Sequence, residues 1–259
     1  MKLYIKDYST YKSDEEDIDI KKTLKQKYKL DTRRQDAFIH LGLYGAMLLK
    51  EKTVIDKDDE LYVTSGIGNV DVVQKTNTRV YEQNQPLKLF DFINLLGNTT
   101  SYYIASALGI SGKNIFQISD NFTFINTLIS LYASINHSQK NAILCSIDLA
   151  STPNEVIKRV LGVDEDCSVV SGVNYQKFSL TKDDAIAEIE FDTLSYSFDE
   201  INNILKDNNT KVIFSKRCDN FFETYPSYII NDAIKNDEDI IFVDSFEDRY
   251  KILKLKSLK

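Results

Sequence analysis

The sequence predicts an α/β protein with a mostly parallel sheet that is covered by helices. Short apolar runs at 61–64, 115–118 and 142–147 are separated by longer stretches in which apolar residues recur every three or four positions. Strands that alternate with helices of this length are typical of a parallel sheet with helices on both faces. With a first strand at Lys2–Ile5, the expected order through residue 147 is β-α-β-α-β-α-β.

Three helices are expected between these strands. The first runs from Arg33 to about Lys52, and the second runs from about Asn94 to Leu108, where Gly109 suits the left-handed residue that ends a helix. The third begins at Phe122. Its apolar residues fall on one face because they are three and four positions apart: Ile125, Leu128, Ile129, Tyr132 and Ile135.

The rest of the chain carries weaker signals. The expected strands and helices there are strands at 168–173, 185–191, 211–214 and 239–243 and helices at 198–205 and 227–234. We expect a large domain over residues 1–192 and an abbreviated βα segment over residues 193–259. No flexible linker or low-complexity segment separates them, so the second part is expected to pack on the first.

The composition is that of an ordinary folded domain. Its 259 residues suffice for a buried core, and 42% of them are hydrophobic and 27% charged. A net charge of −7 argues against sequence-independent binding of nucleic acid, which needs a basic surface. The basic stretches Lys21–Lys29 and Lys251–Lys259 either receive an acidic partner or are solvated surface.

The cysteines and the leader region indicate a cytoplasmic protein. Cys145, Cys167 and Cys218 lack the spacing of a metal site, and no signal peptide precedes them. No apolar run approaches the roughly 20 residues of a membrane span. The loop Gly66–Gly68 lacks the third glycine of a dinucleotide site. Neither a metal nor any other cofactor is expected.

A strand-to-helix elbow is the most informative feature for function. The strand at 115–118 leads through three polar residues into the helix that starts at Phe122. Such an elbow gathers backbone N–H groups and the positive end of the helix dipole, so a thiol there would be acidic and reactive. Here the residue is a phenylalanine. Its neighbours are not cysteines either: Asn121, Thr123 and Phe124.

Residues 30–150 resemble the N-terminal half of β-ketoacyl synthases, the condensing enzymes of fatty-acid and polyketide assembly. The resemblance rests on the order of several segments: Asp31–Arg34 before a helix, Leu61–Asn69 as strand and glycine loop, Phe90–Asn94, Asn98 before Ile104 and Ala105, and the elbow at Phe122. It implies a thiolase-like fold. The second half is expected to be abbreviated, because few residues follow Phe191.

The resemblance also implies a catalytic set that this chain lacks. In the family a cysteine stands where Phe122 is found, and histidines come from His-Gly-Thr and Asn-x-Phe-Gly motifs in the second half. Neither motif is present, and the only histidines are His40 and His137, which suit helix packing and a helix C-terminus. The chain therefore resembles a chain-length factor, the class that has lost the cysteine and pairs with an active synthase. No catalytic residue and no activity of the chain alone are expected.

The resemblance places the strand before the elbow at the sheet edge, against a two-fold-related partner. Ile115, Phe116, Gln117 and Ile118 are apolar enough that such an edge needs cover. We expect a heterodimer with a cysteine-containing β-ketoacyl synthase, because a homodimer would have no catalytic site. An acyl carrier protein would dock mainly through that partner, since both it and this chain are acidic.

Phe122, Thr123 and Phe124 are expected to form the wall of a pocket or tunnel, in which Phe122 either limits the depth or only fills a vestigial pocket. The resemblance suggests a polyketide, aryl-polyene or fatty-acid-like product. Two alternatives stay open. One is a thiolase-like acyltransferase or hydrolase that uses Ser119, Thr123 or Cys145 as nucleophile, although Cys145 lies in an apolar strand. The other is a binding protein on a βα sheet without acyl chemistry.

Overall fold

Nine strands form one sheet in the order β3-β2-β4-β5-β1-β6-β9-β8-β7 in the computed structural model, which describes residues 1–119, 121–150, 158, 169–206, 208–215 and 224–259. The bounds of these strands are β1 Lys2–Lys12, β2 Glu60–Ser65, β3 Asn114–Ile118, β4 Ala142–Asp148, β5 Gly172–Ser179, β6 Ala187–Phe191, β7 Lys211–Phe214, β8 Ile240–Phe246 and β9 Arg249–Ser257.

Helices connect most of these strands. Their bounds in chain order are α1 Ile20–Gln26, α2 Ala37–Lys50, α3 Val70–Asn77, the π-helical turn η1 Thr78–Glu82, α4 Leu89–Leu95, α5 Gly97–Leu108, α6 Thr123–Ser138, α8 Phe198–Leu205 and α9 Tyr225–Lys235. The expected order β-α-β-α-β-α-β through residue 147 is confirmed, with several helices in place of one between β1 and β2 and between β2 and β3.

The described sheet contains one unit twice, joined by antiparallel pairing of β1 with β6. Outward from this pair, the first half runs β1-β5-β4-β2-β3 and the second half runs β6-β9-β8-β7. In both halves the first two neighbouring pairs are antiparallel and the next pair is parallel. In the described residues the second half therefore repeats the first without a counterpart of β3, which agrees with the expected abbreviation.

The predicted α/β class is confirmed, but the sheet is mixed and not mostly parallel. Only the pairs β2–β3, β2–β4 and β7–β8 are parallel, whereas five pairs are antiparallel. One cause is β9, which the sequence did not predict. It follows β8 after only Glu247 and Asp248, a connection too short for the crossover that parallel strands need.

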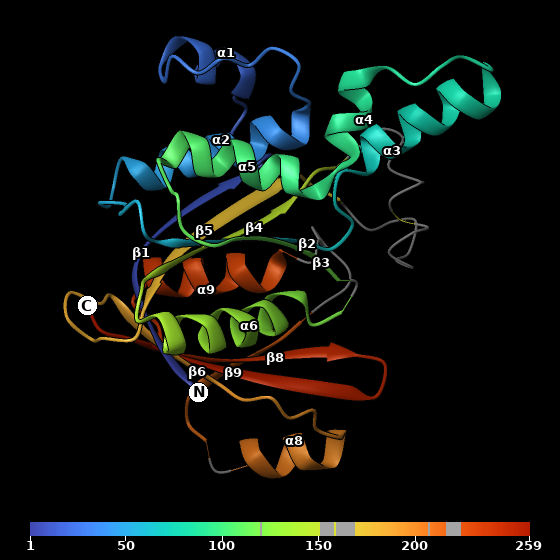
Figure 1. Ribbon diagram of the computed structural model, residues 1–259. Helices are drawn as coiled ribbons and strands as arrows, with labels where there is room; N and C mark the ends of the chain where they lie inside the picture. Colours follow the sequence, from blue (N-terminus) through green and yellow to red (C-terminus); the bar gives the residue numbers. More distant parts are fainter. Residues whose placement is uncertain (120, 151–157, 159–168, 207, 216–223) are drawn as a thin grey trace.

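Two helices, α6 and α9, lie between the two halves of the sheet, and other helices cover the outer faces (Figure 1). Side chains alternate between the faces of a strand. On β2, Tyr62 packs in the central cluster with Leu128 of α6 and Ile230 of α9, whereas Leu61 packs with α2 and α5. Ile201 of α8 packs on the outer face of the second half. The result is five alternating layers, and the core fills both sides of each half-sheet.

The outer helix α2 approaches the sheet closely because it has glycines where it crosses β5. A Cβ atom on Gly45 would lie 2.8 Å from Cε2 of Tyr175 and 2.9 Å from both methyl groups of Val173. The Tyr175 hydroxyl also donates a hydrogen bond of 2.7 Å to the backbone oxygen of Gly42. A side chain at position 45 would push the helix away from β5.

Local capping explains one shifted boundary. α2 begins at Ala37 and not at Arg33, because the Asp36 carboxylate accepts a hydrogen bond of 3.0 Å from the Ile39 N–H and so caps the helix there. Of the strand expected at 168–173, only the last two residues belong to β5, and residue 168 lies outside the described residues. The division of the chain at residue 192 stays a prediction.

Candidate functional site

The chain turns from β3 into α6 at Phe122, which immediately precedes the helix. Phe122 has φ 46° and ψ 28°, in the left-handed region. This conformation costs a residue with a side chain about 1–2 kcal/mol, so the surrounding structure must hold it. The Ser119 N–H donates a hydrogen bond of 3.2 Å to the Ser65 carbonyl, and the Thr123 hydroxyl donates one of 2.6 Å to the Ser119 carbonyl. These bonds fix the elbow on both sides.

The ring of Phe122 packs against the β8–β9 hairpin of the second half. Only 8% of Phe122 is exposed. The ring meets that of Phe246 edge to face, with the centroids 6.4 Å apart and an angle of 74° between the planes. The Nζ atom of Lys251 lies 5.8 Å from the centroid of the Phe122 ring. An aromatic and a cationic side chain from the other half thus cover the elbow.

The tip of this hairpin is a second strained point. Glu247 has φ 51° in the turn between Phe246 and Arg249, at a place where two-residue turns favour glycine. Left-handed residues at both the elbow and the hairpin flank one aromatic contact.

Lys251 is buried, although the sequence suggested that its basic stretch either is solvated or meets an acidic partner. Only 7% of the residue is exposed, and it pairs with Asp244 across β8 and β9. Its Nζ donates a hydrogen bond of 3.4 Å to the Thr193 carbonyl. Burial lowers the pKa of Lys251, while the nearby carboxylates of Asp192 and Asp244 act in the opposite direction. The lysine thus belongs to the site around Phe122.

A buried carboxylate lies at the end of β4. The Oδ1 atom of Asp148 accepts hydrogen bonds from the Ser65 hydroxyl at 2.6 Å and from the Gly66 N–H at 3.0 Å. Its Oδ2 atom accepts one of 3.0 Å from the N–H of Thr224, which precedes α9. Burial raises the pKa of Asp148 to about 6. This carboxylate connects the loop after β2 to the second half.

The other candidate wall residues and nucleophiles are buried, except Ser119, which is half-buried. Thr123 is 1% exposed and Phe124 is fully buried among the core residues around α6. The Ser119 hydroxyl donates a hydrogen bond of 2.9 Å to the Asn121 carbonyl. Cys145 is fully buried, and burial raises the pKa of its thiol. None of these side chains has the environment of an activated nucleophile.

The two histidines lie away from the elbow. His40 is buried in α2, where its Nε2 atom lies 3.2 Å from the Thr32 carbonyl oxygen, and burial lowers its pKa. His137 is in the last turn of α6, fourteen residues after Thr123, which corresponds to about 20 Å along the helix axis. A nucleophile at position 122 would have no imidazole beside it.

The strand before the elbow lies at the end of the sheet. β3 pairs with β2 in parallel and has no strand on its other side among the described residues. Ile118 is 55% exposed. Phe116 packs inward against Phe38 of α2, with ring centroids 6.4 Å apart. The strand is therefore anchored on its inner side and open along its edge.

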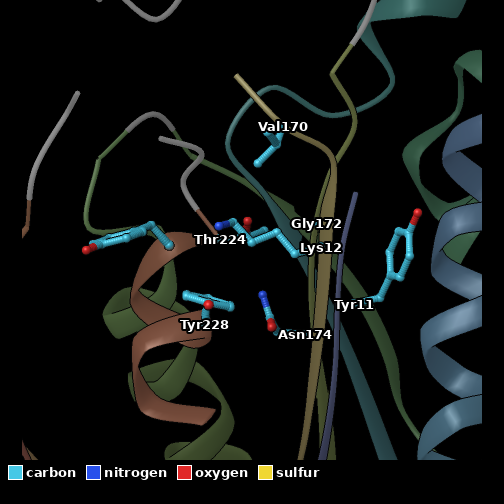
Figure 2. A pocket seen from close by; sticks show the side chains of 8 residues that line it. Tyr11, Lys12, Val170, Gly172, Asn174, Thr224 and Tyr228 are labelled. Atoms are coloured by element: carbon cyan, nitrogen blue, oxygen red, sulfur yellow. The ribbon is translucent and has the colours of Figure 1, made fainter. Parts of the chain in front are cut away.

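A small, partly open cavity lies where α9 begins, beside β1 and β5, and has a volume of about 20 Å³. Figure 2 shows the Asn174 side chain directed into the space near Thr224, Lys12 and Tyr228. Asn174 is 2% exposed, and its Oδ1 atom has no hydrogen-bond partner among the described residues. A cavity of this size holds one water molecule and is too small for an acyl chain.

Comparison with known proteins relates this site to a fold. No family model matches the sequence, and no curated protein matches it. Solved structures match over the whole chain. The ishigamide ketosynthase/chain length factor superposes with a TM-score of 0.73 at 9% identity, over 100% of each chain. The ketosynthase ApeO in complex with its chain length factor ApeC, from Xenorhabdus doucetiae, gives 0.62 at 9% identity over 98% of this chain and 99% of the other.

A third structure has a type II polyketide synthase acyl-carrier protein in complex with its ketosynthase, AntDE:AntF. It matches with a TM-score of 0.64 at 10% identity over 99% of each chain. The chain has the ketosynthase fold. The predicted thiolase-like fold is thereby confirmed. In the ketosynthase fold the family resemblance puts the nucleophile at the start of α6, where this chain has Phe122.

Among the side chains that the structure describes, no three of His, Cys, Asp or Glu lie close enough to hold a metal ion. In the same ranges, no helix is long and apolar enough to cross a lipid bilayer.

Proposed function

We propose that this chain is a non-catalytic ketosynthase-like subunit, a chain-length factor that pairs with an active β-ketoacyl synthase. The observation that carries the proposal is Phe122, which keeps the strained backbone of a nucleophile elbow but has no nucleophilic group. A left-handed backbone is strained for a phenylalanine. Because Phe122 has this conformation without a nucleophilic group, we infer that the elbow contributes the shape of the site and not a reacting group. Two of the matched structures contain a chain length factor, which supports this class.

The surroundings of the elbow also favour a non-catalytic role. The ring of Phe122 is covered by Phe246, and the ammonium group of Lys251 lies near its face. These groups cover position 122, where the family resemblance places the reacting cysteine. The hydroxyls of Ser119 and Thr123 donate to backbone carbonyls, which leaves them without a base.

The open edge of β3 is the surface that we assign to the partner. Ile115, Phe116, Gln117 and Ile118 form a short edge strand with an exposed apolar end, and such an edge invites pairing with another strand. A cysteine-containing synthase is the partner that restores a catalytic site. In one matched structure a ketosynthase is in complex with its chain length factor, which is an assembly of this kind.

The complex would act on carrier-bound acyl chains in the cytoplasm, as in polyketide, aryl-polyene or fatty-acid-like synthesis. The acyl carrier protein would dock mainly on the synthase, because a net charge of −7 makes this chain a poor surface for an acidic carrier. Phe122, Thr123 and Phe124 would then contribute to the wall of the product tunnel. Their role rests on shape, since the chain supplies no reacting group.

Co-expression with cysteine-containing synthases encoded beside the gene tests the proposal. We expect a complex that extends a carrier-bound thioester, whereas the purified chain alone leaves the same thioester unchanged. Phe122→Ala should lengthen the product if the ring ends the tunnel. Turnover by the chain alone contradicts the proposal, and so does a stable monomer that binds none of these synthases at micromolar concentration.

A further inference from the structure

Lys251 is a buried lysine whose ammonium group faces Phe122. Its Nζ atom lies 5.8 Å from the centroid of the ring, and only 7% of the residue is exposed. Burying an ammonium group is unfavourable unless other groups compensate. Here the Thr193 carbonyl at 3.4 Å and the carboxylates of Asp192 and Asp244 offset part of this cost. The lysine is thus held in place from its own half of the molecule, independently of Phe122.

The position of Lys251 favours one orientation of the ring. A cation near the face of an aromatic ring is attracted by it, and more strongly when both are shielded from water. Phe246 meets the same ring edge to face. Phe122 is therefore held from two directions by residues of one hairpin, whose turn contains the left-handed Glu247.

We infer that Lys251 is the positioning residue for Phe122. With Phe246, it keeps the ring seated over the start of α6, so that the second half of the chain determines the shape of the wall at the elbow. The consequence for product length rests on the proposed function. The placement of the ammonium group beside position 122 does not rest on the proposed function. This placement can be tested on the isolated chain.

A cysteine at position 122 reports the placement directly. We compare Phe122→Cys with Phe122→Cys/Lys251→Met and measure thiolate absorbance against pH, with Phe122→Ser and Phe122→Ser/Lys251→Met as blanks. An ammonium group nearby stabilises a thiolate, so removal of Lys251 should raise the thiol pKa by about one unit. Equal thiol pKa values with and without Lys251 overturn the inference.

Two further variants accompany this measurement, one as a control and one as a replacement for Lys251→Met. Lys256→Met removes an exposed lysine of the same strand and should leave the pKa of the thiol at position 122 unchanged. Lys251→Gln keeps a long polar side chain without the charge and replaces Lys251→Met if the latter does not fold. It should raise the pKa of the thiol to the same extent, and an unchanged pKa counts against the inference.

Product length tests the consequence in the synthase complex. Lys251→Met should shift the distribution of product lengths in the same direction as Phe122→Ala, whereas Lys256→Met should not shift it. If Phe122→Ala changes the length and Lys251→Met does not, the positioning role is wrong and the proposed function stands. If no complex forms with any synthase, the proposed function fails. The thiol pKa at position 122 then still shows whether the ammonium group of Lys251 lies beside that position.

Discussion

Asp148, the last residue of β4, accepts a hydrogen bond of 3.0 Å from the backbone N–H of Thr224, the residue before α9. In the other half, Phe246 ends β8 and packs on Phe122, the residue before α6. β4 and β8 hold equivalent places in the repeated strand order. In each half, the last residue of this strand therefore contacts the residue before the central helix of the other half. The contact is polar at Asp148 and aromatic at Phe246.

Burial of the Asp148 carboxyl makes the free energy of unfolding depend on pH. Burial raises its pKa from 3.8 to about 6, so between these values the native state binds more protons than the unfolded state. The stabilising contribution of Asp148 to the free energy of unfolding is therefore fully present below about pH 4 and is lost as the pH rises through 6. The shift corresponds to about 3 kcal/mol. Urea unfolding between pH 4 and 7 should show this loss.

Asp148→Asn should remove that part of the pH dependence, because the amide does not titrate. Asp248→Asn, at an exposed position of the hairpin turn, is the control and should keep the wild-type slope. An Asp148→Asn protein whose stability changes with pH as the wild type does would contradict the assignment of the slope to this carboxylate.

Glu247→Gly should stabilise the protein by about 1 kcal/mol. Glu247 is exposed and has φ 51°, a conformation that glycine adopts without the steric cost of a side chain. Asp248→Gly in the same turn relieves no strain and should be neutral or destabilising. The urea midpoints of the two variants give the comparison. A lower midpoint for Glu247→Gly would show that the Glu247 side chain contributes more than its backbone costs.

Much of the fold could be predicted because the signals are local. α8 and β7 have the predicted bounds, since a capping box at Ser197 and Glu200 and a short apolar run mark them. β9 was missed. Its lysines suggested a basic surface or a site for an acidic partner, although Leu253 and Leu255 alternate with them as in a strand with one buried face.

The site could be predicted only in part. The elbow at Phe122 is visible in the sequence because a strand, polar residues and a helix follow one another directly. Phe246 and Lys251 lie more than 120 positions away along the chain, and only the pairing of the two halves brings them to the elbow. No local signal in the sequence marks either residue as part of the site.

Gly45→Ala should destabilise the protein by about 1–2 kcal/mol, because the added methyl group would overlap Tyr175 and Val173 in a packed layer. Alanine is the better helix former, so overlap has to outweigh that gain. Gly109→Ala is the comparison, because no atom lies within 4 Å of the new Cβ. Its only cost is the left-handed backbone, with φ 80°, which should destabilise the protein by about 1 kcal/mol. A stabilised Gly45→Ala protein would show that α2 can move away from β5 at little cost.

Ile118→Lys should abolish pairing with the synthase while leaving the fold intact. Ile118 is 55% exposed at the open edge of β3, so its replacement should change the free energy of unfolding by no more than about 0.5 kcal/mol. A lysine there places a charge where the partner strand would bury an apolar side chain. Val54→Lys is the control, because Val54 is 84% exposed and lies outside β3. Co-purification with the synthase should survive in Val54→Lys and fail in Ile118→Lys. Equal recovery of both complexes would place the partner on another surface.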